Sequence, residues 1–343
     1  MIGRAADRLL DAPRVAPEEA ALKSAVDELG GEVVKLRSRD GLRLAARWLP
    51  SEVGPVAGIG EGSDPGGEPW APDPYEAILL LHGWTGSVAP DVVELGPTLR
   101  RTAGVLALDF RGHGGSDDAP TTFGLHEIED VAGALTWFGE RGIRRVALVG
   151  SSMGGIVALA SIVVLGDGSL VQADLDPTAP VAAEAPRPRI VGAVVESVAP
   201  DLRTPIANRM GLPIGGPLRR AIAGRMFTIA GRRMGGDLRA TEPGRIIGLV
   251  EPVPLLLIHG EADRTVRPSD GRRLAALAGP SATHWAVPGG EHGRSRRAAP
   301  AQWDERVSRF LRLAFFDARE VVPIIHATGE PAADSDLSGP EGD

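Results

Sequence analysis

The chain has 343 residues, of which 43% are hydrophobic and 24% charged, so it can bury a sizeable core as a folded globular protein. It has no cysteine, which excludes disulfides, thiolate metal ligands and a cysteine nucleophile. The longest apolar run, residues 155–166, is too short to cross a bilayer. The first thirty residues are charged throughout and lack the apolar core of a signal peptide. We therefore expect a cytoplasmic protein with no membrane span.

The net charge of −8 is concentrated in two segments. Residues 51–74 and residues 327–343 each hold five acidic residues and no basic one, so the rest of the chain is nearly neutral. Apart from Lys23 and Lys35 the basic residues are all arginine, and no run combines basic with aromatic residues. This pattern argues against nucleic acid as a partner.

Residues 1–30 are predicted to form a helical extension, and after them short apolar runs alternate with longer amphipathic segments. The first two strands flank the turn SRDG and are predicted to be antiparallel, whereas helix-length segments between the later strands imply right-handed parallel crossovers. The fold class is therefore α/β, with helices on both faces of a mostly parallel sheet. The predicted strands are Glu32–Arg37, Leu42–Trp48, Ala77–His82, Val105–Asp109, Arg145–Gly150, Ile190–Glu196, Leu255–His259 and His284–Val287, and the predicted helices include Leu125–Arg141, Gly154–Leu165, Ser269–Ala278 and Pro300–Phe315.

Four segments depart from this alternation. Residues 51–74 and 166–188 are rich in loop-forming residues and are predicted to be long loops. The tail at 327–343 has the composition of a disordered segment. Residues 201–250 carry nine arginines against three acids, and we expect a small helical cap there, inserted into a core of residues 31–200 and 251–317. The alternative is an ordinary crossover, but the segment is far longer than a crossover requires.

The pattern G-x-S-x-G occurs at Gly150-Ser151-Ser152-Met153-Gly154, directly between an apolar strand and an apolar helix. A sharp strand–turn–helix of this kind exposes its central serine at the end of the sheet, beside the positive end of the helix. The bare pattern is weak, because a chain rich in glycine and serine produces it by chance. Its setting makes Ser152 the candidate nucleophile.

A serine needs a base that is held by a third group. Asp263 and His292 each follow a predicted strand, and the loops at the carboxyl ends of parallel strands gather at one edge of the sheet. We therefore predict His292 as the base and Asp263 as the acid. Glu196 is the alternative acid, with a loop-capping role as its simpler interpretation. The other histidines considered as bases are His259 and His284, on predicted strands, and His326, near the tail.

The segment LLLHGWTGS, residues 79–87, has the pattern of an oxyanion loop. The backbone N–H groups of Trp84 and Met153 are the predicted donors to a tetrahedral oxyanion. His82 is expected to hold this loop rather than to catalyse. Asp109 and the glycine-rich segment RGHGGSD, residues 111–117, are expected to order their own loop.

Together these motifs resemble an α/β-hydrolase of the serine-esterase type over residues 31–317. The resemblance implies a Ser152–His292–Asp263 triad, an oxyanion hole at Trp84 and Met153, and an eight-stranded sheet with a cap inserted after the sixth strand. The segment TTFGLHEIEDVAGALTWF, residues 121–138, further resembles the bacterial Bem46/YqkD-like branch. The motifs that carry the resemblance are HGWTG (82–86), LDFRGHGGSD (108–117), GSSMGG (150–155), HGEAD (259–263) and PGGEHG (288–293).

The resemblance implies hydrolysis of a small-molecule ester, and we expect a short or medium acyl chain. A serine at the elbow argues against the epoxide hydrolases and dehalogenases, which resemble this family but use aspartate there. No metal or organic cofactor is implied. Trp84 and three cap residues, Met210, Met226 and Phe227, are the expected pocket side chains. Alternatives are a serine peptidase or aminopeptidase, a thioesterase or acyltransferase, and a non-catalytic binding module. The sequence does not predict an oligomeric state.

Overall fold

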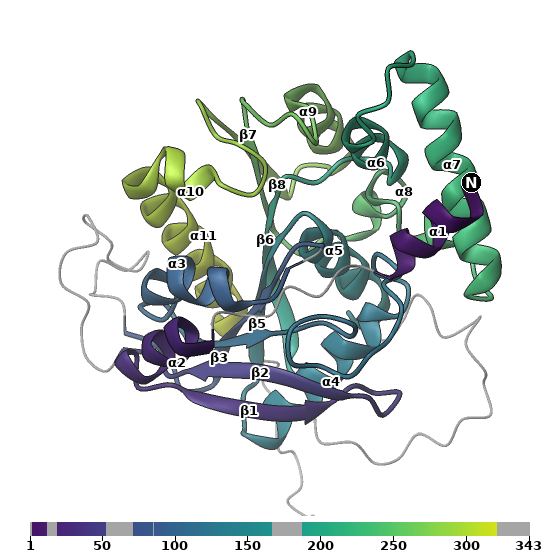
Figure 1. The fold of residues 1–343 in the computed structure, drawn as a ribbon. Helices are drawn as coiled ribbons and strands as arrows, with labels where there is room; N and C mark the ends of the chain where they lie inside the picture. The colour runs from purple at the N-terminus through teal and green to yellow at the C-terminus, as the bar shows by residue number, and fades with distance from the viewer. Residues whose placement is uncertain (1, 12–18, 53–70, 85, 167–186, 321–343) are drawn as a thin grey trace, which may run out of the picture.

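Eight strands form one sheet in the order β1-β2-β4-β3-β5-β6-β7-β8, in a computed structural model that describes residues 2–11, 19–52, 71–84, 86–166 and 187–320 (Figure 1). Strand β2 pairs antiparallel with β1 and β4, and the strands from β3 onward pair parallel. The predicted α/β fold is confirmed, with strand ends that differ from prediction by one or two residues. The strands are β1 (Glu32–Arg37), β2 (Arg43–Leu49), β3 (Glu76–Leu81), β4 (Gly104–Leu108), β5 (Arg145–Ser151), β6 (Arg189–Glu196), β7 (Leu255–Gly260) and β8 (Ala282–Val287).

The central strands are buried on both faces because helices cover the sheet from two sides. Successive side chains of a strand point to opposite faces, so in β3 Leu79 and Leu81 join one apolar cluster while Ile78 and Leu80 join the other. Helices α4 and α5 cover the first face, and α3 and α11 cover the second (Figure 1). The longer helices outside the 201–250 segment are α1 (Ile2–Leu10), α2 (Glu19–Glu28), α3 (Ala89–Leu99), α4 (Glu127–Glu140), α5 (Met153–Leu165), α9 (Pro268–Leu277) and α11 (Pro300–Glu320), with the single turn α10 (Ser295–Ala298) before α11.

Helix α3 was not among the predicted helices, because its sequence contains Gly96 and Pro97, which both disfavour helix. Tertiary packing explains the glycine. A Cβ on Gly96 would lie 2.8 Å from the end of the Leu49 side chain of β2, so glycine lets the helix approach the sheet without displacing that side chain. The local preference is overridden by contact with the core.

The segment 201–250 is mainly helical and lies beyond the end of β6, beside α5 (Figure 1). Helix α1 packs on its longest helix, where Ala6 and Leu9 are buried and Arg233 forms an ion pair with Asp7. We call this segment the insert; it comprises α6 (Arg203–Arg209), α7 (Gly216–Arg233), η1 (Leu238–Thr241), α8 (Pro243–Ile246) and η2 (Ile247–Leu249).

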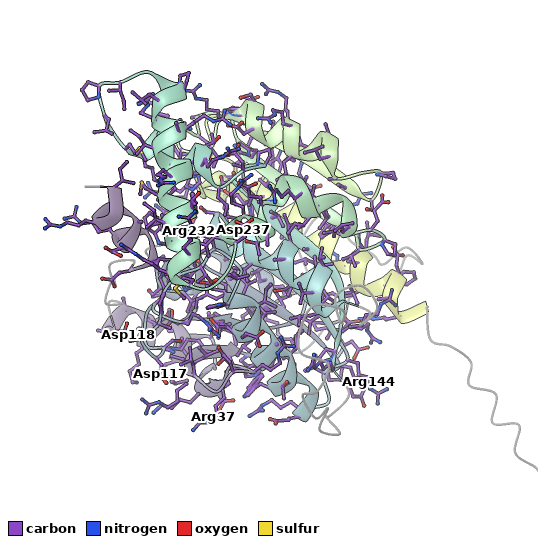
Figure 2. The ribbon with its side chains drawn as sticks, turned by 90° about the vertical axis from the view of Figure 1, so that its right-hand side faces the viewer. Arg37, Asp117, Asp118, Arg144, Arg232 and Asp237 are labelled. Carbon is purple, nitrogen blue, oxygen red and sulfur yellow. The ribbon has the colours of Figure 1, made fainter. Side chains whose placement is uncertain are left out.

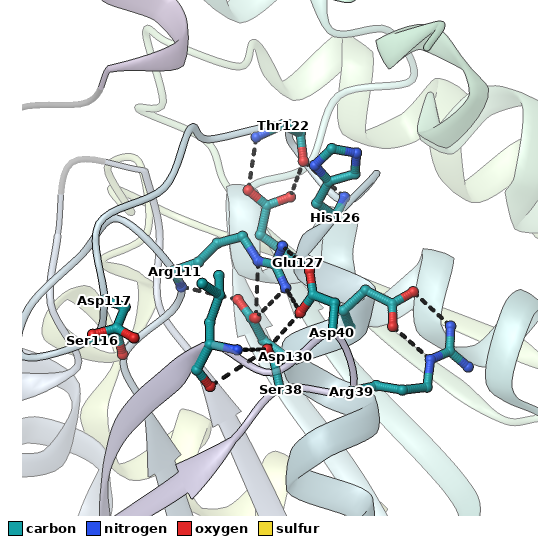
Figure 3. Close-up of polar contacts among 12 residues, drawn as sticks. Ser38, Arg39, Asp40, Arg111, Ser116, Asp117, Thr122, His126, Glu127 and Asp130 are labelled. Carbon is teal, nitrogen blue, oxygen red and sulfur yellow. Dashed lines mark hydrogen bonds and ion pairs between the residues drawn. The ribbon is translucent and has the colours of Figure 1, made fainter. Parts of the chain in front are cut away.

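A cluster of charges, buried at Arg111 and Asp130 and exposed at Asp40, ties the β1–β2 hairpin to the rest of the core (Figure 3). The Arg111 guanidinium donates to Asp130 at 2.7 and 2.9 Å and to both carboxylate oxygens of Asp40 at 2.8 Å. Its side chain is only 3% exposed, and the Asp130 side chain is fully buried. By contrast, the exposed Arg37 lies at the edge of the molecule (Figure 2).

Several predictions fall outside the described residues. These are most of the 51–74 loop, nearly all of the 166–188 loop, His326 and the 327–343 tail. The division into a core and a cap stays a prediction. Within the described residues, no helix has an apolar stretch long enough to cross a membrane.

Candidate active site

Ser152 lies on a tight turn between β5 and α5. Its φ of 53° is in the left-handed region, which a side chain other than glycine rarely adopts. Two flanking glycines make the turn possible. A Cβ on Gly150 would lie 2.4 Å from the carbonyl oxygen of Gly154, and one on Gly154 would lie 2.1 Å from the carbonyl oxygen of Leu81. The chain therefore folds back on itself and against the end of β3, with Ser152 at the apex.

His292 connects Ser152 to Asp263, although the three residues come from loops far apart in the sequence. Its Nε2 lies 3.0 Å from Ser152 Oγ, and its Nδ1 lies 2.8 Å from Asp263 Oδ2. A carboxylate only accepts, so Nδ1–H donates to Asp263 and Nε2 is left free to accept from the serine hydroxyl. The arrangement can remove a proton from Ser152.

Asp263 is held in place by its own loop. Its side chain is fully buried, and Oδ1 accepts hydrogen bonds from the backbone N–H groups of Thr265 and Val266, both at 2.8 Å. Burial alone would raise the pKa of Asp263, but the hydrogen bond and charge of His292, together with the Val266 N–H, outweigh it and lower the pKa. The carboxylate therefore stays ionised and oriented toward His292.

Glu196, the alternative acid, has a different role in the loop. Its Oε1 accepts from the backbone N–H of Ser295 at 2.8 Å, which fixes the start of α10. Burial raises the pKa of Glu196, opposed by the Ser295 hydrogen bond. Next to it, Ser197 Oγ accepts from the Gly293 N–H at 3.0 Å and so braces the residue that follows His292. These contacts agree with the loop-capping interpretation of Glu196.

The other histidines considered as bases are engaged elsewhere. His259 is buried, and its Nε2 contacts the Val266 carbonyl oxygen at 2.9 Å, so it packs behind the Asp263 loop. His284 is half-buried on β8, where burial lowers its pKa. In the described part of the chain, the histidine that contacts Ser152 is His292.

The loop after β3 lies directly against Ser152. A Cβ on Gly83 would be 3.6 Å from Ser152 Cβ, so the Gly83–Trp84 peptide borders the nucleophile. His82 holds that peptide: its Nε2 accepts from the Phe110 N–H at 3.1 Å, so Nδ1–H donates to the Gly83 carbonyl at 2.7 Å. Burial, aided by the charge of a neighbouring histidine, lowers the pKa of His82 to about 4. His82 is thus a neutral loop-holding residue at pH 7.

Asp109 joins two loops at this edge of the sheet. Its Oδ1 accepts from the Val88 N–H at 2.8 Å, and its Oδ2 accepts from the Gly115 N–H at 3.1 Å. A Cβ on Gly114 would lie 2.2 Å from the Asp109 carboxylate, so glycine is required at that position. The contacts agree with the loop-ordering role expected for Asp109 and the glycine-rich segment.

A cavity opens above Ser152, between the sheet edge and α6 of the insert. Its empty space totals about 470 Å³, including the part that is open to solvent. The walls are mainly apolar, which suits an acyl chain. The lining residues are Trp84, Phe123, Ser152, Met153, Ile156, Ser197, Val198, Ala199, Asp201, Leu202, Pro205, Ile206, Arg209, Thr265 and Val266.

Of the expected pocket side chains, Trp84 lines this cavity and the other three do not. Met226 and Phe227 are buried in the core, where α7 packs on α1 and α6, and Met210 packs against the same cluster. Phe227 lies behind the lining residue Phe123, with ring centroids 5.7 Å apart. The expectation for Met210, Met226 and Phe227 is therefore corrected.

Phe123 was missed because its exposure to the cavity depends on an unusual backbone. Its φ is 54°, and the buried Glu127 holds the loop around it by accepting from the N–H groups of Thr122 at 2.7 Å and Gly124 at 2.8 Å (Figure 3). Thr241 of the insert donates to the Phe123 carbonyl at 3.0 Å. Other lining residues directly follow β6 and β7, and the sheet-edge argument that located Asp263 extends to them.

Within the described residues, no three His, Cys, Asp or Glu side chains gather in an arrangement that could hold a metal ion.

The model of the alpha/beta hydrolase family matches residues 78–318, well over half of the chain. The chain belongs to the alpha/beta hydrolase family. The match includes the turn at Ser152 and the loops that carry Asp263 and His292. The match does not distinguish one branch of the family from another, so the resemblance to the Bem46/YqkD-like branch stays a prediction.

Among proteins of known sequence, this hydrolase-family chain is similar to the uncharacterized protein YfhR of Escherichia coli O157:H7. The two are 26% identical over 269 residues, which cover 78% of this chain and 75% of YfhR. A shorter match, 32% identical over 127 residues, relates it to a serine hydrolase-like protein of Dictyostelium discoideum and covers 33% of this chain and 32% of that one.

Solved structures of the same fold agree with the architecture. An alpha-beta hydrolase from Vibrio vulnificus superposes with a TM-score of 0.61 at 18% identity and covers 89% of this chain and 92% of its own. The esterase Pf2001 of Pyrococcus furiosus gives a TM-score of 0.59 at 20% identity and covers 89% and 97%. At these identities the likeness concerns the fold.

Proposed function

We propose that this family member hydrolyses carboxylic esters of short or medium acyl chain, with Ser152 as the nucleophile. The observation that carries the proposal is the hydrogen-bonded series Asp263–His292–Ser152 at the floor of an apolar cavity. Such a series activates a serine hydroxyl for attack on a carbonyl carbon. The apolar walls support an acyl chain as the bound group.

In the first half of the reaction, His292 Nε2 takes the proton of Ser152 Oγ while Oγ bonds to the ester carbonyl carbon. The Asp263 carboxylate stabilises the imidazolium that results and keeps its Nδ1–H directed away from the substrate. The tetrahedral intermediate then expels the alcohol, which receives the proton from Nε2. The products of this half are the free alcohol and an acyl group esterified to Ser152.

In the second half, water replaces the alcohol. His292 Nε2 takes a proton from the water as its oxygen attacks the acyl carbon, and then returns the proton to Ser152 Oγ as the acid leaves. The overall reaction consumes only the ester and one water molecule. The protein ends in the state in which it began.

We propose the N–H groups of Met153 and Trp84 as the donors to the oxyanion. Met153 is the first residue of α5, and the first N–H groups of a helix have no partner within the helix. His82 supports the second donor, because it holds the carbonyl of the Gly83–Trp84 peptide, whose N–H points the opposite way. Both donors are therefore fixed before substrate binds.

The test is hydrolysis of p-nitrophenyl esters from C2 to C16 by the wild-type protein, Ser152→Ala and Ser151→Ala. We expect the highest kcat/KM between C2 and C8, a loss of at least about 10³-fold in Ser152→Ala, and retained activity in Ser151→Ala. Activity that survives in Ser152→Ala would contradict the proposal. A folded protein that cleaves aminoacyl p-nitroanilides but no ester would support a peptidase instead.

A further inference from the structure

The cavity above Ser152 contains an arginine that has no ion-pair partner among the described residues. Arg209 is the last residue of α6 and lines the same cavity as Ser152. It is the one arginine, lysine or histidine among the described residues that line this cavity. Its guanidinium carbon lies 5.9 Å from the centroid of the Trp84 ring, so the charged group is directed over the aromatic wall of the cavity.

Arg209 makes no hydrogen bond or ion pair within the described part of the chain, unlike the nearby carboxylate. Asp201, the one acidic residue of the cavity lining, accepts from the Thr204 N–H at 2.9 Å and from Arg220 at 3.3 Å. Its charge is thus matched from within the insert. Arg209 has no such direct partner, although the charge of Asp263 acts on it from the triad.

Arg209 places a charge at the edge of an otherwise apolar wall. The wall beside it is formed by apolar side chains, including Leu202, Pro205 and Ile206. Burial lowers the pKa of Arg209, opposed by the charge of Asp263, but a guanidinium remains protonated at neutral pH. Arg209 is nevertheless an exposed residue, so water reaches its guanidinium in the free protein. An anionic group entering the cavity would meet a cation that has no ion-pair partner among the described residues.

We propose that Arg209 selects esters that carry a carboxylate at a distance from the scissile carbonyl. This inference rests on the proposed function and names its substrate class. The planar guanidinium can bind a carboxylate through two parallel hydrogen bonds, while the apolar wall accommodates the carbon chain between the two groups. The carboxylate can belong to the acyl part or to the alcohol part, and the test separates these two sources.

Two matched pairs of substrates make the test. The acyl-side pair is the mono-p-nitrophenyl ester of adipic acid and its methyl-capped neutral counterpart, both followed by p-nitrophenolate release. The alcohol-side pair is the butyrate ester of 4-hydroxybenzoate and the corresponding ester of methyl 4-hydroxybenzoate, followed by chromatography of the phenol. Within each pair only the charge of the remote group changes appreciably.

The variants are Arg209→Gln, Arg209→Lys and, as the control, Arg232→Gln. Arg232 is exposed on α7 of the same insert and does not line the cavity, so its substitution removes the same charge elsewhere (Figure 2). We expect Arg209→Gln to lower kcat/KM for one anionic ester by roughly 10- to 100-fold, mainly through KM, and its neutral counterpart by less than about 3-fold. Arg209→Lys should recover part of the loss, and Arg232→Gln should change neither ester.

The pair that responds identifies the part of the substrate that carries the carboxylate. Equal effects of Arg209→Gln on the anionic and neutral members of both pairs would overturn the inference, as would a wild-type preference for both neutral esters. In either case hydrolysis of the neutral esters would leave the proposed function standing. Failure of the wild-type protein to cleave any of the four esters would overturn the proposed function and this inference with it.

Discussion

Replacing Asp263 by asparagine tests the roles of the three connected side chains most sharply, because the structure dictates which way the new amide will face. Oδ1 of Asp263 accepts from two backbone N–H groups, those of Thr265 and Val266, and Oδ2 accepts from His292. An asparagine has one oxygen for these two sets of donors. The donors that face the NH₂ group therefore lose their hydrogen-bond acceptor.

The magnitudes decide between the two orientations. Directing the NH₂ group at the backbone would leave two buried N–H groups unsatisfied, at about 1–3 kcal/mol each. Directing it at His292 costs less, because the imidazole can change tautomer and accept at Nδ1. Nε2 then carries the proton and can no longer accept from Ser152. We therefore expect kcat to fall on the order of 10⁴-fold while the fold is retained.

The assay is kcat for p-nitrophenyl butyrate, with far-UV circular dichroism and urea unfolding to confirm the fold. The control is Asp270→Asn, because Asp270 is also buried but lies on α9 and does not line the cavity; it should leave kcat within about 3-fold. Glu196→Gln tests the alternative, that Glu196 is the acid that holds His292. A loss below 10-fold in Asp263→Asn, with a larger loss in Glu196→Gln, would refute the assignment of Asp263.

Three further predictions concern the structure around the site. Gly154→Ala should lower the free energy of unfolding by about 1–3 kcal/mol or more, measured by urea unfolding, because the new Cβ would lie 2.1 Å from the Leu81 carbonyl oxygen. His82 has its pKa lowered to about 4, so the folded state disfavours its protonation; stability should fall by on the order of 3 kcal/mol as pH drops from 6.5 to 4, and this component should be absent in His82→Gln. Arg111→Met should cost about 3–5 kcal/mol of stability, seen as a lower urea midpoint, because it leaves the buried Asp130 carboxylate unpaired.

Each of these predictions has its own counter-result. A Gly154→Ala protein of wild-type stability would mean that the turn does not approach β3 as closely as described. Parallel pH profiles for the wild type and His82→Gln would mean that His82 is not held neutral. For the third, the matched control is Arg43→Met, which removes an exposed pair with Asp117 and should cost less than about 1 kcal/mol; equal losses in the two variants would contradict the argument from burial.

Local sequence patterns predicted the strands and the Ser152 turn well, because both depend on neighbouring residues. Apolar runs mark the buried strands, and the glycines at positions 150 and 154 mark the only kind of residue that fits the turn. The convergence of Ser152, Asp263 and His292 followed from one topological rule, that the carboxyl ends of parallel strands share an edge. The structure brings these three side chains into contact.

The cavity wall was harder to predict, because it depends on how the insert packs. The sequence of α7 does not reveal which face meets the core, and the face with Met226 and Phe227 proved to be buried. Phe123 reaches the cavity only because Glu127 and Thr241 hold its loop in a left-handed conformation. Helix α3 was missed for a related reason, since its glycine packs against a side chain of β2 that the local sequence does not reveal.

The central claim is that Ser152 is the activated nucleophile, and covalent labelling tests it most directly. The full-length protein is treated with a fluorophosphonate probe, which reacts with activated serines, and the adduct is located by peptide mass spectrometry. We predict one adduct, on Ser152, formed at a rate that falls at least about 10²-fold in His292→Ala. No adduct on a folded protein, or an adduct on the adjacent Ser151, would contradict the account.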